Sequence, residues 1–200
     1  MIYKQALAAA LSIALLTLMS ASAPGNRLLF RNSLGTREWE ATWSSFEFSF
    51  FATGSTCALT LRGSLHSSTI TKTRSLLVGY VTNASTGGCG PFLAATVLTA
   101  NLPWHVRYQS FAGALPRIER VGLQIIGFEY RMRENGINIA CLYRSTAEAP
   151  LNMDWLLTST GAVRSAELSG ELLSECRIVE HERVISTPSS FSPSASITLI

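Results

Sequence analysis

Two stretches of strict alternation, each interrupted by one change of parity, constrain the fold of this 200-residue chain most strongly. Apolar residues occupy every second position from Trp39 to Trp43 and then, with the opposite parity, from Phe46 to Phe50. A period of two is typical of a half-buried β-strand. One extra residue at Ser44–Ser45 keeps both apolar sets on the same face, so the pattern predicts a β-bulge there.

The same change of parity recurs later in the chain. Alternate residues are apolar over Val121–Ile125, and the alternation resumes with shifted parity over Ile126–Met132. A bulge near Ile125–Gly127 restores a common inward face. Long strands that bend in this way are what a closed or strongly curled sheet requires.

The rest of the chain also predicts strands, separated by turns rich in Gly, Pro and Asn. The Asn135–Gly136 dipeptide between two alternating runs indicates a hairpin. A helix competes over Gly161–Glu175, which we assign as strand or irregular, and Ser186–Ser194 is expected to be a loop. The fold class is therefore all-β, an antiparallel β-sandwich or β-barrel of about ten strands. The further strands are expected at Thr56–Leu61, Ser75–Thr82, Phe92–Thr99, Trp104–Phe111, Ile137–Tyr143, Leu151–Thr158, Arg177–Ile185 and Ala195–Ile200.

The N-terminal segment has the composition of a secretory signal peptide. It carries a cation at Lys4, an apolar run over Ala6–Met19 and small residues before Pro24. We expect a signal helix in residues 1–23 and a single secreted β-rich domain in residues 24–200, located outside the cell or in the cell envelope. An uncleaved anchor is the alternative. No later stretch is long and apolar enough to form a membrane-spanning helix.

Four cysteines lie within the expected secreted domain. They are widely spaced, and the absence of a Cys-x-x-Cys pair disfavours a zinc site or a redox centre. An even number of cysteines in an exported protein predicts two disulfide bonds. Three connectivities are open, and we favour Cys57 with Cys176 and Cys89 with Cys141, which would join early strands to late ones.

Charge composition excludes several function classes. The 16 Lys and Arg residues form no block and are nearly balanced by 13 Asp and Glu, so no nucleic-acid partner is expected. Asp154 is the only aspartate, which disfavours calcium loops and sites with two metals. We expect no metal and no cofactor.

The best candidate for ligand binding is a short polar row. Alternation in Trp104–Gln109 places His105, Arg107 and Gln109 on the more polar face of one strand. An imidazole, a guanidinium and an amide in a row suit an anionic or sugar-like ligand. The competing interpretation is a solvated outer face with no ligand.

Candidates for catalysis are weaker. His66 in a serine-rich turn could serve as a base for a serine, but no Gly-x-Ser-x-Gly motif and no orienting third group are evident. His181 lies in a charged, exposed-looking segment. A glycosidase pair would have to come from glutamates that alternate with apolar residues and so favour the wet face of a sheet, namely Glu38, Glu40, Glu47, Glu119 and Glu129. No catalytic residue is assigned.

The four tryptophans could stack on sugar rings, yet each lies on the apolar side of its own strand. Burial in the core is therefore the favoured interpretation for Trp39, Trp43, Trp104 and Trp155.

Several segments carry a resemblance that covers about half of the expected secreted domain. They are Thr56–Ser67, Val78–Thr82, Leu102–Phe111 and Ile197–Ile200. In these segments the chain resembles a group of small uncharacterised secreted proteins of actinobacteria. The resemblance implies an exported, β-rich bacterial protein and brings no catalytic residues with it.

These observations favour a secreted or envelope-associated, non-enzymatic β-domain with a binding or structural role. Its partner would be an extracellular ligand or an envelope component. One alternative is an extracellular hydrolase using His66 or His105. The other is a barrel that holds a small apolar ligand, which requires an interior cavity.

Overall fold

The computed structural model describes residues 27–48, 55–90, 93–134, 140–176 and 179–200. The expected signal peptide and the Asn135–Gly136 turn lie outside these residues. In the described part no helix occurs and every strand pairing is antiparallel. The strands are β1 (Arg27–Asn32), β2 (Glu38–Phe48), β3 (Ser55–Leu65), β4 (Thr69–Thr71), β5 (Leu77–Gly87), β6 (Leu93–Val97), β7 (Trp104–Ala112), β8 (Arg120–Ile126), β9 (Glu129–Glu134), β10 (Ala140–Arg144), β11 (Leu151–Leu157), β12 (Val163–Cys176), β13 (Val179–Ser186), β14 (Ser190–Ser192) and β15 (Ala195–Leu199).

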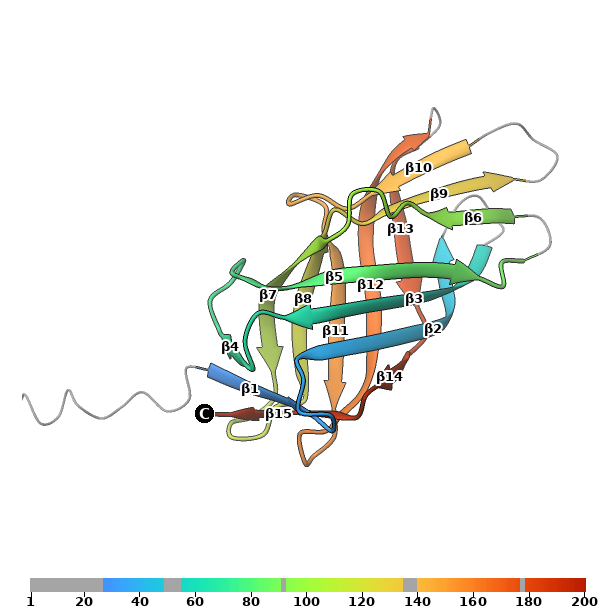
Figure 1. Ribbon diagram of the computed structural model, residues 1–200. Helices are drawn as coiled ribbons and strands as arrows, with labels where there is room; N and C mark the ends of the chain where they lie inside the picture. Colours follow the sequence, from blue (N-terminus) through green and yellow to red (C-terminus); the bar gives the residue numbers. More distant parts are fainter. Residues whose placement is uncertain (1–26, 49–54, 91–92, 135–139, 177–178) are drawn as a thin grey trace, which may run out of the picture.

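Eight of these strands close into a barrel (Figure 1). Their order is β11-β8-β7-β5-β3-β2-β13-β12, and β12 pairs with β11 to complete the ring. Because each strand in the ring has two neighbours, the barrel wall has no free edge. The predicted all-β fold is thus confirmed, and of the two architectures it is the barrel.

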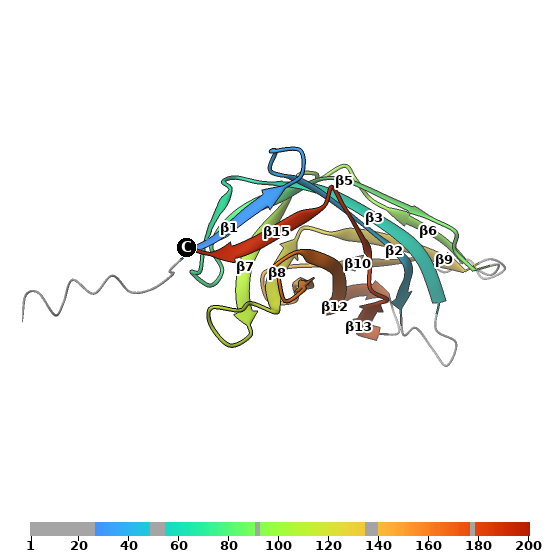
Figure 2. The same ribbon diagram turned by 90° about the horizontal axis from the view of Figure 1, so that it is seen from below.

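The remaining strands lie at opposite ends of the barrel. Strands β10, β9 and β6 extend the sheet from β12, whereas β1 pairs with β4 and β15 at the other end (Figures 1 and 2). The short β14 pairs with β2. Strands β1 and β4 were not predicted, and β14 lies in the segment that was predicted to be a loop, so the described residues contain more strands than the ten expected.

The register of β2 against β3 contains the first predicted bulge. Trp43 lies opposite Leu59 and Phe46 opposite Cys57, so three steps along β2 match two steps along β3. Trp43 and Phe46 are both fully buried on the inner face. The extra residue therefore keeps both apolar sets inside, as the parity change predicted.

The second predicted parity change is also present and separates two strands. Ile125 at the end of β8 and Phe128 before β9 are both fully buried. Between them Gly127 has φ +96°, a conformation that favours glycine, and a Cβ atom there would lie 3.2 Å from the Trp104 ring. After this bend β9 leaves the barrel and pairs with β10 in the extension.

The ambiguous segment over 161–175 is mostly the long strand β12. One half of β12 pairs with β11, with Ser169 opposite Asn152, and its other end pairs with β10, with Ser174 opposite Tyr143. Leu172 is fully buried on the inner face of the strand. Two successive neighbours along one edge explain why this strand is long.

The predicted disulfide number is confirmed, but the favoured connectivity is wrong. Cys57 pairs with Cys89, and Cys141 pairs with Cys176, with Cα atoms 4.1 and 4.8 Å apart. Each bond joins neighbouring strands rather than early strands to late ones. The register of β3 with β5 ends at Ala58 opposite Gly87, so Cys89, two residues beyond β5, lies close to Cys57. The register of β10 with β12, continued beyond Tyr143 opposite Ser174, brings Cys176 opposite Cys141.

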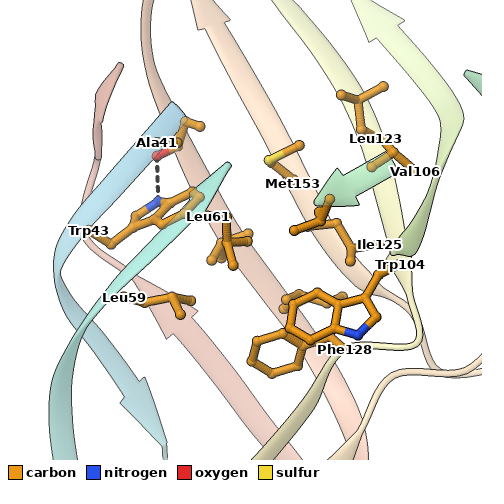
Figure 3. Packing of buried hydrophobic residues seen from close by; sticks show 14 of the residues in the cluster. Ala41, Trp43, Leu59, Leu61, Trp104, Val106, Leu123, Ile125, Phe128 and Met153 are labelled. Carbon is orange, nitrogen blue, oxygen red and sulfur yellow. Dashed lines mark hydrogen bonds between the residues drawn. The ribbon is translucent and has the colours of Figure 1, made fainter. Parts of the chain in front are cut away.

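The barrel interior is filled by side chains. All four tryptophans are at most 1% exposed, which confirms the predicted core role. Figure 3 shows Trp43 and Leu61 from one wall facing Trp104, Ile125 and other apolar residues from the opposite wall. The Trp43 Nε1–H donates to the Ala166 carbonyl oxygen over 2.9 Å, which satisfies its buried donor.

Candidate functional site

A surface groove of about 400 Å³ lies on the outer face of the barrel, over β2, β3 and β5. Its lining residues include two carboxylates, one guanidinium, one amide and several hydroxyls. The groove is bounded on one side by Ser192, the last residue of β14, and by Pro193. The lining residues are Glu38, Trp39, Glu40, Arg62, Gly63, Ser64, Thr82, Asn83, Ser192 and Pro193.

A bulge in β5 shapes this groove. Asn83 lies opposite Arg62 and Val81 lies opposite Gly63, so Thr82 is the extra residue. Thr82 and Asn83 are both exposed, although they are consecutive in a strand. The bulge therefore turns two adjacent polar side chains to the outer face, as bulges near functional sites commonly do.

The groove floor is set by close packing of Trp39 against Gly63. A Cβ atom at position 63 would overlap both the Trp39 ring and the Tyr80 carbonyl oxygen, so only glycine fits there. Trp39 is 1% exposed, and its Nε1–H has no hydrogen-bond partner among the described residues. The Trp155 Nε1–H is likewise without a partner among those residues, and the two indole rings pack against each other with centroids 5.7 Å apart.

Opposite charges meet along one side of the groove. Arg62 Nε donates to Glu40 Oε2 in an ion pair, while the side chains stay 63% and 33% exposed. Glu38, two residues before Glu40 on the same face, is exposed. The Thr82 hydroxyl donates to the Arg62 carbonyl oxygen over 3.4 Å. Donors and acceptors at this density suit a ligand with several hydroxyl groups.

Three aromatic rings lie beside the groove and form what we call the ring strip, made of His66, Tyr80 and His105. The ring centroids of His66 and Tyr80 are 4.6 Å apart, and those of Tyr80 and His105 are 5.6 Å apart. Both imidazoles are exposed and Tyr80 is half-buried. The strip runs over the ends of three neighbouring strands, β3, β5 and β7.

The predicted polar row on β7 lies on the outer face, as its alternation implied. His105 is exposed, and Arg107 and Gln109 are half-buried, whereas Trp104 and Val106 point into the core. Arg74 Nε donates to Gln109 Oε1 over 3.3 Å. Whether the row binds a ligand stays a prediction.

The other predicted candidates do not converge. Neither His66 nor His105 has a side-chain hydrogen bond to a serine or a carboxylate among the described residues. His181 lies on β13 opposite Leu173. The described part of the chain holds no cluster of three or more His, Cys, Asp or Glu that could bind a metal ion.

The glutamates considered as a catalytic pair lie outside the core, and three of them are in ion pairs. Glu40 pairs with Arg62, Glu119 with Arg117 at 4.0 Å, and Glu129 with Arg144 at 3.2 Å. Glu38 is exposed and Glu47 is half-buried.

Two acids outside the groove have raised pKa values, the buried Glu182 and the half-buried Asp154. Glu182 on β13 is 3% exposed, its Oε1 has no hydrogen-bond partner in the described part of the chain, and burial raises the pKa of its carboxyl. Burial, with a smaller contribution from the Glu182 carboxylate, raises the pKa of Tyr143. Burial also raises the pKa of Asp154, against the opposing effect of Arg120 at 3.5 Å.

Sequence reasoning missed Tyr80 and the groove residues of β3 and β5. Alternation over Val78–Thr82 gives the facing of Tyr80, but its position beside His105 follows only from the register of β5 against β7. The β5 bulge was missed because only one buried residue, Ala84, follows it to mark the change of parity.

Comparison with protein-family models, with curated proteins and with solved structures finds no match. The search for membrane-spanning helices within the described residues finds none that qualifies. The geometry of the outer wall is therefore the basis for a functional proposal.

Proposed function

We propose that this chain is an exported, non-enzymatic binding protein whose outer groove takes a small, hydroxyl-rich ligand of the sugar class. The observation that carries the proposal is the groove itself. It brings charged, amide and hydroxyl side chains from β2, β3 and β5 together in one hollow. Several convergent hydrogen-bonding groups suit a ligand with several hydroxyls.

Export is part of the proposal. Two disulfide bonds are compatible with an oxidising extracellular compartment. The composition of residues 1–23 and the resemblance to secreted actinobacterial proteins support the same compartment. Expression in a bacterial host, followed by mass spectrometry of the exported protein, should give a mature N-terminus at Pro24. Recovery only in the cytoplasm would contradict this part.

The geometry supports binding more than the two alternatives. His66 and His105 contact Tyr80 and lack the acid or base partner that a hydrolase would need within the described residues. A lipocalin-like role requires an interior cavity, whereas the described interior is packed with tryptophan and phenylalanine side chains.

The test is titration calorimetry with glucose, galactose, N-acetylglucosamine and their disaccharides. The variants Arg62→Ala and Asn83→Ala should each weaken binding by about tenfold, because each removes a hydrogen-bonding group from the groove. Arg117→Ala, which removes an exposed guanidinium outside the groove, is the control and should bind like the wild type. Equal affinities for all three variants would contradict the proposal.

A further inference from the structure

Charge is segregated across the outer wall of the barrel. Strand β2 carries glutamates, including Glu38 and Glu40 in the groove. Strands β3, β5, β7 and β8 carry no Asp or Glu in their described sequences. The wall is therefore acidic at its β2 side and basic towards β7, where His105 and Arg107 lie on the outer face.

The groove and the ring strip are continuous. The register places Glu38 opposite Ser64, Ser64 opposite Tyr80, and Tyr80 opposite His105. These four residues form one row across β2, β3, β5 and β7. Three steps between neighbouring strands span about 14 Å. That distance exceeds one sugar ring, so a monosaccharide in the groove would leave the ring strip uncovered.

The two parts of this row offer different chemistry. The groove presents hydroxyl, amide and carboxylate groups, whereas the strip presents the half-buried Tyr80 ring between two exposed imidazoles. The apolar C–H face of a sugar can pack on an aromatic ring while its hydroxyls stay hydrated.

Arg107 supplies an anion site at the basic end of the row. It lies two residues from His105 on the same face of β7 and has no ion-pair partner among the described residues. A half-buried guanidinium without a partner favours a planar carboxylate, which it can bind through two parallel hydrogen bonds.

We propose that the groove and the ring strip together bind an acidic oligosaccharide that lies across β2, β3, β5 and β7. A sugar ring occupies the groove, a second packs on Tyr80, and the carboxylate of a uronic acid meets Arg107 and His105. This inference rests on the proposed sugar-binding function and adds the length and the charge of the ligand.

The test is titration calorimetry with galacturonic acid and with galactose dimers and trimers in which one terminal ring is galacturonic acid, against neutral galactose oligomers of the same lengths. Affinity for the acidic series should rise at least tenfold from monomer to trimer. Tyr80→Ala should lower trimer affinity about tenfold through loss of ring contact, whereas Tyr80→Phe should retain it. Arg107→Gln should abolish the preference for acidic over neutral trimers.

His105→Ala is the second variant, since its side chain is exposed and its loss leaves the core intact. It should weaken trimer binding and leave the circular dichroism spectrum unchanged.

Four results would overturn the inference. Affinity that does not grow with length, or that is unaffected by both Tyr80→Ala and His105→Ala, would restrict binding to the groove and leave the proposed function standing. Equal affinity for acidic and neutral trimers would remove the charge assignment. Absence of binding to every saccharide would reject the proposed function together with the inference.

Discussion

Two bulges in neighbouring parts of the barrel wall have opposite consequences. The bulge in β2 at Ser44–Ser45 keeps large aromatic side chains on the inner face, with Trp43 and Phe46 fully buried on either side. The bulge in β5 at Thr82–Asn83 instead turns two consecutive polar side chains to the outer face and helps form the groove. The same backbone irregularity preserves the core in one strand and shapes a surface in the other.

Deleting one residue from each bulge in turn should separate these two roles. Of the changes considered, deletion in β2 should lower the stability of the fold the most. Deletion of Ser44 reverses the facing of Phe46 and Phe48. Removal of one large core aromatic costs about 3–5 kcal/mol, so exposing two should exceed the stability of a typical domain. We expect no cooperative unfolding transition in urea, followed by circular dichroism.

Deletion of Thr82 is the matched change in β5. It reverses a segment in which Ala84 is the one buried apolar side chain, so the protein should still fold but lose the groove. If both deletions unfold the protein, or if neither does, the distinction between the two bulges is wrong.

A disulfide bond joins the two regions and gives the next largest effect. Cys57 lies opposite Phe46 beside the β2 bulge, and Cys89 follows the end of β5. The double replacement of Cys57 and Cys89 by Ala should destabilise the protein by about 2–5 kcal/mol in urea unfolding.

The control is the double replacement of Cys141 and Cys176 by Ala in the strand extension, where the sequence separation is 35 rather than 32 residues. Both pairs should cost similar free energy because they close similar loops. Only loss of the first pair should speed amide exchange near Thr82. Faster exchange there in both variants would show that the disulfide does not act locally.

A smaller effect is expected from a methyl group under the groove. Gly63→Ala places a Cβ atom against the Trp39 ring and the Tyr80 carbonyl oxygen, and should destabilise the fold by about 1–3 kcal/mol. Gly87→Ala is the matched control, because no heavy atom lies within 4 Å of its Cβ position. A thermal shift of equal size in both variants would contradict the close packing at position 63.

The smallest effect is expected in the pH dependence of stability, where the buried Glu182 should contribute and the exposed groove carboxylates should not. Burial raises the pKa of Glu182 in the folded state, so the folded protein holds this proton more tightly than the unfolded chain. Stability should therefore fall as the pH rises from the ordinary glutamate pKa through the raised value. Glu182→Gln should remove that fall, measured by urea unfolding at a series of pH values.

Glu38→Gln removes an exposed carboxylate and serves as its control. This variant should keep the pH dependence of the wild type. An unchanged pH dependence in Glu182→Gln would show that the buried carboxyl is not its source.

The sequence predicts which face of the sheet a side chain occupies better than it predicts which strands pair, and the two bulges show why. Residues from Trp39 to Phe48 contain enough large apolar side chains to reveal the parity change within one strand. The strand partner of β2 on its other side is β13, far along the chain, and no local pattern encodes that register. The same lack of information made the favoured disulfide connectivity wrong, because connectivity depends on which strands are adjacent.

In the candidate site, too, the sequence predicted the face that side chains occupy and not the pairing of strands. Alternation placed His105, Arg107 and Gln109 on the outer face, and the structure confirms that facing. The contact of His105 with Tyr80 depends on the pairing of β5 with β7, and the groove depends on a bulge marked by a single small residue, Ala84.

The pairing of β2 with β13 also governs when the ring can be completed. Val184 on β13 lies opposite Phe48 on β2, so the strand that closes the barrel is made near the end of synthesis. Contacts between segments so distant in the chain slow folding, because the intervening loop must be ordered first. A nascent chain that stops short of β13 leaves β2 with an unpaired edge, and the barrel stays open until β13 has been synthesised.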